Sequence, residues 1–148
     1  MNIVKCTENY LHQLVELFEE YRVFCGFEKS PQETTQFLKS LICNETSTIF
    51  IAIEPETDSV MGFVNLYPCY SSLALQRLWI LNDLGVSSRF RGKGVSKALI
   101  QRVQAFAKET NAIRIELKAK ANNTTARSLY KTLGFTIDTD NVYYRVPC

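Results

Sequence analysis

The chain lacks the features that mark metal sites, secretion and membrane insertion. Its five cysteines are odd in number and scattered, and no two of them form a Cys-x-x-Cys pair. Neither a zinc site nor a disulfide framework is therefore expected, and we predict no bound metal. The N-terminal residues contain no apolar signal core, and no run approaches the roughly 18 apolar residues of a membrane span. These absences favour a cytoplasmic protein with free thiols and no membrane partner.

An excess of one charge is also missing. The chain has 17 Lys and Arg against 15 Asp and Glu, a net charge of +2. Such a small excess does not provide the broad basic face that nucleic-acid binding needs. With 148 residues, of which 46% are hydrophobic, the chain is long enough to bury a core, and we predict one domain over residues 1–148. The only histidine, His12, lies off the apolar stripe of its predicted helix and is given no role.

Apolar spacing divides the chain into strands and helices. Strands are expected at residues 2–6, 47–53, 60–67, 78–86, 113–117, 135–137 and 142–146. The first two helices are recognised by their apolar faces, which consist of Leu11, Leu14, Val15, Phe18 and Tyr21 and of Phe37, Leu38 and Leu41. Ser30-Pro31 should start the second helix, and two more are expected over residues 94–110 and 123–133. This order predicts a mixed α/β protein.

The segment from Val86 to Leu99 is the most informative stretch of the chain. It reads as the end of a strand, a polar loop with a Gly-x-Gly turn, and the first turn of an amphipathic helix. Gly92 and Gly94 allow backbone angles that a Cβ would resist, and the first amides of a helix are free to bind an anion. A pyrophosphate fits such a loop. The alternative is an ordinary strand-to-helix loop on a basic surface.

Two common phosphate loops do not match this segment. A Walker loop needs Gly where the chain has Ser87, and Ser or Thr where it has Gly94. The dinucleotide fingerprint needs a third Gly or Ala at the position of Lys97. The anion site therefore belongs to another family.

Two motifs together resemble the GNAT superfamily of N-acetyltransferases. The family's pyrophosphate loop, Arg/Gln-x-x-Gly-x-Gly/Ala, is matched by residues 89–94. Its later motif, Asn-x-x-Ala-x-x-x-Tyr-x-x-x-Gly-Phe, is matched by residues 123–135. The resemblance covers residues 60–136 well. It implies a GNAT fold: a mixed, mostly antiparallel sheet of about seven strands in the order β-α-α-β-β-β-α-β-α-β-β, flanked by four helices.

The resemblance implies acetyl-CoA as cosubstrate and assigns residues to it. The pyrophosphate would lie on the loop and the start of the following helix. The residues concerned are Arg91, Gly92, Lys93, Gly94, Val95, Ser96 and Lys97. Ser96 stands where many members have a further Gly, and its hydroxyl is small enough to be accommodated. Backbone groups of Leu84 and Val86 would bind the cofactor arm beside a bulge, which Gly85 would permit. Asn123 would hydrogen-bond that arm, with a helix cap as its other role.

Tyr130 and Asp83 are the predicted catalytic residues. Tyr130 matches the family's general acid, since a phenol with a pKa near 10 is protonated at neutral pH; it would also contact the cofactor. The alternative is an amphipathic wall residue. Asp83 is the candidate base, because a carboxylate in an apolar strand is costly without a task or a partner. A structural Asp83, hydrogen-bonded to a neighbouring loop, stays open. Asn82 replaces the Glu of diamine acetyltransferases, which weakens a polyamine assignment.

The predicted activity is transfer of acetyl from acetyl-CoA to a primary amine of a small molecule or peptide, directly and in a ternary complex. The alternative is a non-catalytic acetyl-CoA-binding module. The first two helices and residues 67–72 should frame the acceptor. Tyr67, Tyr70 and Trp79 are candidates for an aromatic wall, and Glu19 or Glu20 for attracting a cation. The alternatives are core aromatics and solvated carboxylates. A homodimer is left open, as is the identity of the acceptor.

Overall fold

The β-rich runs of the sequence form one five-stranded sheet in the order β1-β2-β3-β4-β5. The computed structural model describes residues 1–148. The strands are β1 (Asn2–Lys5), β2 (Thr48–Glu54), β3 (Ser59–Ser71), β4 (Gln76–Val86) and β5 (Ile115–Leu117). The first three pairings are antiparallel, and β5 joins β4 in parallel. The sheet is therefore mixed and mostly antiparallel, as expected.

Four α-helices accompany the sheet, as the sequence predicts: α1 (Leu11–Phe24), α2 (Pro31–Cys43), α3 (Val95–Glu109) and α4 (Thr124–Thr132). Two 3₁₀ turns, η1 (Glu8–Tyr10) and η2 (Ser88–Phe90), precede α1 and α3. The chain divides into two compact units, residues 1–118 and 119–148. None of the helices combines the length and the apolar character that crossing a bilayer requires.

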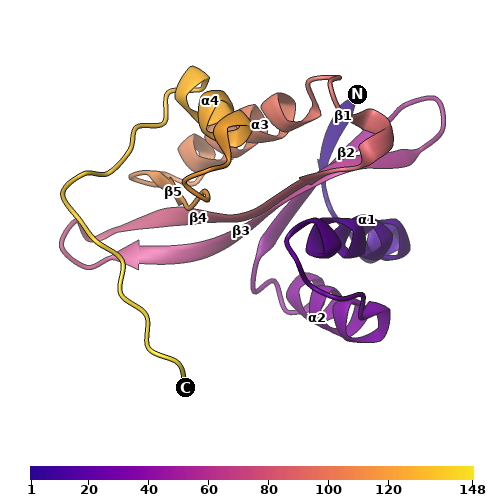
Figure 1. Ribbon diagram of the computed structural model, residues 1–148, viewed down its shortest axis with the longest axis horizontal. Helices are drawn as coiled ribbons and strands as arrows, with labels where there is room; N and C mark the ends of the chain where they lie inside the picture. The colour runs from indigo at the N-terminus through magenta and orange to yellow at the C-terminus, as the bar shows by residue number, and fades with distance from the viewer. The chain divides into compact units, whose positions relative to one another are not determined.

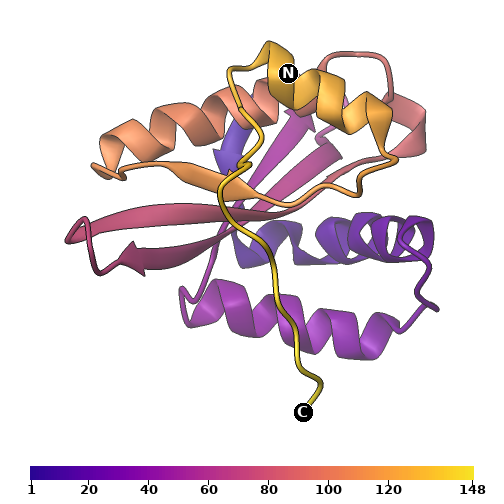
Figure 2. The ribbon, with the colours of Figure 1, turned by 60° about the vertical axis from the view of Figure 1, so that its left-hand side comes forward.

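In the first unit, the sheet separates α1 and α2 from α3 (Figures 1 and 2). On the α1 side, the ring of Phe63 packs on Phe18 and Tyr21. On the other side, a Cβ at Gly62 would lie 2.8 Å from Cγ1 of Val95, so α3 rests closely on β3. Burial of each large apolar side chain contributes about 2 kcal/mol. Both faces of the sheet are thus fixed by packing.

One predicted core residue is exposed. Phe37 keeps 49% of its surface accessible, whereas Leu38 and Leu41 are buried as expected. The buried face of α2 runs through Thr34, Leu38 and Leu41, at spacings of four and three residues. Phe37 lies about 100° around the helix from Leu38 and falls outside this face.

The two C-terminal strands do not form, and the sheet has five strands rather than about seven. Residues 135–148 contain no strand. The predicted turn is present, since Asp138 accepts hydrogen bonds from the backbone of Asp140 and the side chain of Asn141. A strand exists only when another strand takes up its backbone groups, and local alternation cannot supply that partner. Val142, Tyr144 and Val146 are 76–87% exposed.

Candidate acetyl-CoA site

The loop between β4 and α3 has the geometry of an anion site. Gly92 and Gly94 both have φ of +75°, the left-handed region that favours glycine, and Gly94 is the N-cap of α3. Nothing lies within 4 Å of where a Cβ would stand at either glycine. The first intrahelical hydrogen bond runs from the amide of Ala98 to the carbonyl of Gly94. The amides of residues 95–97 therefore have no acceptor within the helix.

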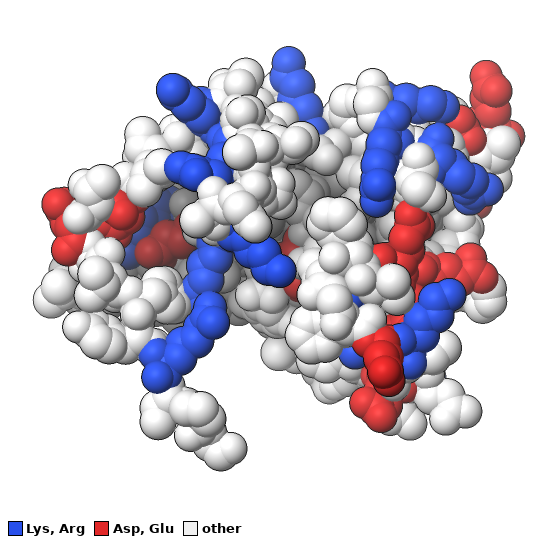
Figure 3. Space-filling model, in the orientation of Figure 1, with Lys and Arg blue, Asp and Glu red and all other residues white.

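Positive charge surrounds this helix start. Arg91, Lys93 and Lys97 are exposed, and none of them takes part in an ion pair. Arg91 lies over the ring of Phe24 and Lys93 over that of Phe90, at 5.8 and 5.2 Å. Figure 3 shows Lys and Arg side chains over the loop that precedes α3. Unneutralised cations beside free amides strengthen the case for a bound anion.

The loop is held in place by contacts on both sides. The buried Phe90 anchors it, and the amide of Ser87 donates to the carbonyl of Met61. Glu20 of α1 accepts a hydrogen bond from the amide of Ser88 at 2.8 Å. Glu20 therefore organises the loop, a role that the sequence pattern did not indicate. Val95 is buried in the core, so only its backbone amide can contribute to binding.

Beside this loop, one edge of β4 is open. The pairing of β4 with β5 covers only Trp79, Ile80 and Leu81, whereas the pairing with β3 continues to Val86. Residues 82–86 therefore have no ladder partner on the β5 side. Leu84 and Val86 lie in this open section, and both are half-buried.

The expected bulge is present in β4, but at a different residue. Asn65 is paired with Asp83 and Leu66 with Leu81, so Asn82 is the extra residue. Gly85 has another purpose: a Cβ there would lie 2.5 Å from Cε1 of Phe63. Gly85 makes room for a core ring, and its role in the bulge was a wrong expectation.

The carboxylate of Asp83 is the centre of a polar cluster on the α1 side. Its Oδ2 accepts hydrogen bonds from Nδ2 of Asn65 and of Asn82, at 2.9 and 3.1 Å. Its Oδ1 accepts one from the hydroxyl of Tyr21, at 3.3 Å. The partners come from β3, β4 and α1, and none is the neighbouring loop that the structural alternative named.

The sequence predicted Asp83 but missed Tyr21 and Asn65 as its partners. Tyr21 was counted on the apolar face of its helix, and its ring does pack there against Phe18 and Phe63. Asn65 stands in an apolar strand just as Asp83 does, and that shared anomaly was the available signal. Burial and the Asp83 charge raise the pKa of Tyr21 above its ordinary value, so its hydroxyl stays a donor.

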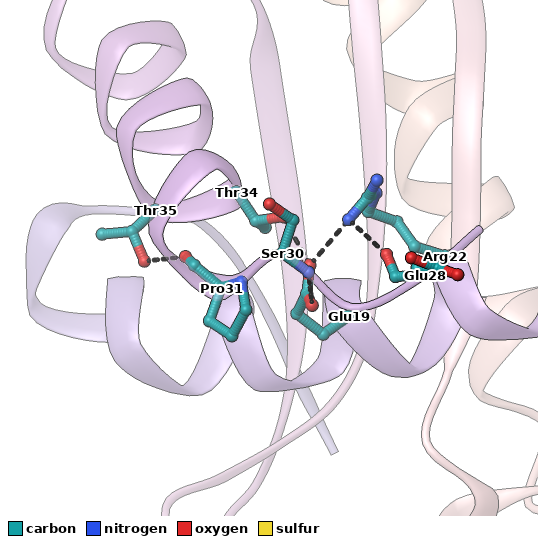
Figure 4. A network of polar contacts seen from close by, with 7 residues as sticks. All are labelled: Glu19, Arg22, Glu28, Ser30, Pro31, Thr34 and Thr35. Atoms are coloured by element: carbon teal, nitrogen blue, oxygen red, sulfur yellow. Dashed lines mark hydrogen bonds and ion pairs between the residues drawn. The ribbon is translucent and has the colours of Figure 1, made fainter.

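Two further candidates for the acceptor side are occupied by partners within the fold. Trp79 is buried, donates from Nε1 to Thr110 and packs on Phe106, which makes it a core residue. Glu19 is also buried, and its carboxylate accepts hydrogen bonds from Ser30 and Thr34 and pairs with Arg22 (Figure 4). Neither side chain is available to an acceptor.

In the second unit, Asn123 is the N-cap of α4, and its Oδ1 accepts from the amide of Ala126 at 3.2 Å. Gly134, at φ of +89°, closes the helix as predicted. Tyr130 lies in the last turn of α4, with its ring 5.8 Å from that of Phe135. Burial raises the pKa of Tyr130 above its ordinary value, so the phenol is protonated at neutral pH.

Comparison with known proteins agrees with this geometry. The model of the acetyltransferase (GNAT) family matches residues 11–135. The chain belongs to the GNAT family. It is 35% identical to an uncharacterized N-acetyltransferase, YhfO, of Bacillus subtilis, over 97% of this chain and 95% of that protein. A probable acetyltransferase of Haemophilus influenzae is 30% identical over 93% and 92% of the two chains.

A solved structure extends the likeness to three dimensions. The crystal structure of a probable acetyltransferase superposes with a TM-score of 0.96 and 36% identity, covering 100% of this chain and 98% of that one. The GNAT chain described here is therefore an N-acetyltransferase, and its fold is the family's α/β fold.

Proposed function

We propose that this enzyme transfers acetyl from acetyl-CoA directly to a primary amine of a small molecule or peptide, within a ternary complex. The observation that carries the proposal is the anion cradle at the start of α3: two left-handed glycines, free amides and unpaired cations. These groups fit the pyrophosphate of acetyl-CoA, which supplies a reactive thioester.

The chain offers groups for each part of that cosubstrate. In this proposal, the amides of Val95, Ser96 and Lys97 and the turn at Gly92 and Gly94 bind the pyrophosphate. The cations of Arg91, Lys93 and Lys97 neutralise its charge, and the hydroxyl of Ser96 donates to a phosphate oxygen. Leu84 and Val86, on the open edge of β4, hydrogen-bond the pantetheine through their backbone.

The proposed chemistry needs a base and an acid. A protonated alkylamine has a pKa near 10, so about one molecule in a thousand is neutral at pH 7. Asp83 is proposed to accept the ammonium proton, after which the amine nitrogen forms the new bond to the acetyl carbon. Tyr130 holds a proton that it can give to the leaving thiolate, and Asn123 binds the cofactor arm. The roles of Tyr130 and Asn123 rest on the family motif.

The chain is further proposed to form a homodimer. The exposed apolar side chains of Val142, Tyr144 and Val146 support this, because a second copy would remove them from water.

Binding of acetyl-CoA tests the proposal directly. Replacing Gly94 by Val puts a branched side chain at φ of +75° and should raise the dissociation constant about tenfold, or about 1.4 kcal/mol. The double variant Arg91→Gln/Lys93→Gln leaves the turn unchanged and should weaken binding, with a smaller dependence on salt. The exposed Lys39→Gln on α2 is the matched control. Wild-type affinity in both folded variants would contradict the assignment of the loop.

Turnover is tested by CoA release over a panel of polyamines, aminoglycosides, amino acids and peptide N-termini. Acetyl-CoA binding with amine-stimulated release supports the proposal. Binding without release by any amine would contradict direct transfer to amines.

A further inference from the structure

The charge of Asp83 has no cationic partner in the chain. All three groups that donate to its carboxylate, from Tyr21, Asn65 and Asn82, are neutral. None of the ion pairs in the structure includes Asp83, although the residue is half-buried. A carboxylate removed from water is usually paired with a cation, because hydrogen bonds from neutral groups leave its charge uncompensated. Asp83 therefore favours an incoming cation.

Asn65 has a buried hydrogen-bond acceptor without a partner in the same cluster. It is fully buried, its Nδ2 is bonded to Asp83, and its Oδ1 has no partner. Reversing the amide would not help, because its oxygen would then face the carboxylate of Asp83. An unpaired buried acceptor is costly. The cluster thus holds an uncompensated negative charge on Asp83 and, beside it, an acceptor that no group of the chain satisfies.

The two oxygens of Asp83 are not equally occupied. Oδ2 accepts two hydrogen bonds, while Oδ1 accepts one, and at 3.3 Å it is the longest of the three. Ordinary O–H···O hydrogen bonds are about 2.5–3.0 Å long, so Oδ1 keeps most of its capacity to accept. The hydroxyl of Tyr21 holds this oxygen loosely and from one direction only.

Two tyrosines lie close to the carboxylate: Tyr21 donates to it, and Tyr67 is near enough to feel its charge. Tyr21 and Phe63 pack edge to face with centroids 5.5 Å apart, and Gly85 leaves the space that Phe63 fills. Burial and, to a smaller extent, the charge of Asp83 raise the pKa of Tyr67 above its ordinary value, while a hydrogen bond with Asn65 partly opposes them. Tyr67 therefore lies close to both Asn65 and Asp83. A carboxylate near aromatic side chains suits an alkylammonium ion, which combines positive charge, several N–H donors and an apolar stem.

We propose that Asp83 receives the acceptor as an alkylammonium ion, and that Tyr21 is a positioning residue that orients the carboxylate toward it. This inference rests on the proposed transfer to an amine and predicts that the enzyme prefers amines that are charged at neutral pH, with uncharged amines such as anilines as weaker substrates. Asp83 then has a binding role before any proton is removed.

An inhibitor with a permanent positive charge allows binding of a cation at Asp83 to be measured separately from removal of its proton. Butyltrimethylammonium cannot lose a proton or accept an acetyl group, so its inhibition of amine acetylation measures cation binding alone. Asp83→Asn should raise its inhibition constant about tenfold, because the charge is lost while the shape is kept. For an alkylamine the variant should raise KM as well as lower kcat. KM for an aniline, which is uncharged at neutral pH, should stay unchanged.

Tyr21→Phe tests the positioning role without creating a cavity in the core. The ring remains on Phe18 and Phe63, and the hydrogen bonds that the hydroxyl makes with Asp83 and Cys25 are lost. We expect KM for the alkylamine to rise about threefold, with little change in melting temperature or in KM for the aniline. Tyr10→Phe is the matched control, since its hydroxyl also donates to an aspartate, Asp58, at an exposed site.

The outcomes are distinguishable from failure of the proposed function. If Asp83→Asn leaves the inhibition constant unchanged while the variant still binds acetyl-CoA, the inference is wrong and the transferase assignment stands. If Tyr21→Phe behaves as Tyr10→Phe does, the positioning role is wrong. If no amine is acetylated by the wild-type protein, the proposed function itself fails.

Discussion

At the scale of single residues, the residue type at several positions is explained by the side chain that contacts it in the fold. Gly85 suits a flexible strand when it is read alone, yet its small size serves the ring of Phe63. Asn65 is a polar residue in an apolar strand, and it is kept there by Asp83. Tyr130 is the residue where a single hydroxyl is expected to matter most for catalysis.

Tyr130→Phe should lower kcat about 100-fold and leave the dissociation constant of acetyl-CoA nearly unchanged, because the ring stays and only the proton donor is removed. Since burial raises the pKa of Tyr130, the wild-type phenol stays protonated throughout the neutral range. Loss of activity through its ionisation should therefore begin only at strongly alkaline pH. Steady-state kinetics, with chemistry verified as the limiting step, measure both effects. A variant with wild-type kcat would remove Tyr130 from the mechanism.

At the scale of elements, the connection between α1 and α2 depends on one buried carboxylate. Glu19 is 5% exposed and accepts hydrogen bonds from the amide of Ser30 and the hydroxyl of Thr34, while Arg22 pairs with it. Figure 4 shows these donors converging on it from the loop and from both helices. Burial alone would raise the pKa of Glu19, but these hydrogen bonds outweigh it and hold the pKa below its ordinary value.

Glu19→Gln should reduce the free energy of unfolding by about 2 kcal/mol at pH 7, because an amide cannot accept from all three donors. Because the pKa of Glu19 is lower in the folded state than in the unfolded state, its charge stabilises the fold at pH values above the unfolded-state pKa. This stabilisation is lost as the pH falls through the folded-state pKa. The difference between wild type and variant should therefore shrink below about pH 4. Urea unfolding at several pH values measures it, with the exposed Glu33→Gln as control. A difference that does not vary with pH would contradict the ionic role.

At the scale of the whole molecule, the C-terminal segment exposes a run of apolar side chains. Its pattern favours a strand, but residues 135–148 form none. Unsatisfied strand-like segments with exposed apolar residues favour association between chains. A homodimer would explain why these side chains are present.

The chain should therefore self-associate in the micromolar range, and Val142→Lys with Val146→Lys should shift it toward monomer. Both valines are more than three-quarters exposed, so the fold should tolerate the change. Leu73→Lys, at a fully exposed leucine of the β3–β4 turn, is the control for added charge. Sedimentation equilibrium measures the association. A wild-type protein that stays monomeric throughout that range would refute the homodimer.

Features determined by neighbours in the sequence could be predicted from the sequence alone. The start of α2 at Pro31, the left-handed turn at Gly94, the cap at Asn123 and the closing glycine Gly134 all depend on a few adjacent residues. The family motif is local in the same sense. The fold class and the candidate anion loop therefore follow from short stretches of sequence.

The tertiary structure decided the features that depend on distant residues. Asp83 meets Asn65 across 18 positions and Tyr21 across 62, so its cluster has no local signature. The exposure of Phe37 depends on which face α2 turns to the sheet, and the bulge at Asn82 on the register between β3 and β4. The prediction of two C-terminal strands was wrong because strand pairing also depends on distant residues. Alternation gives a segment the capacity to pair, but only another strand can supply its hydrogen bonds.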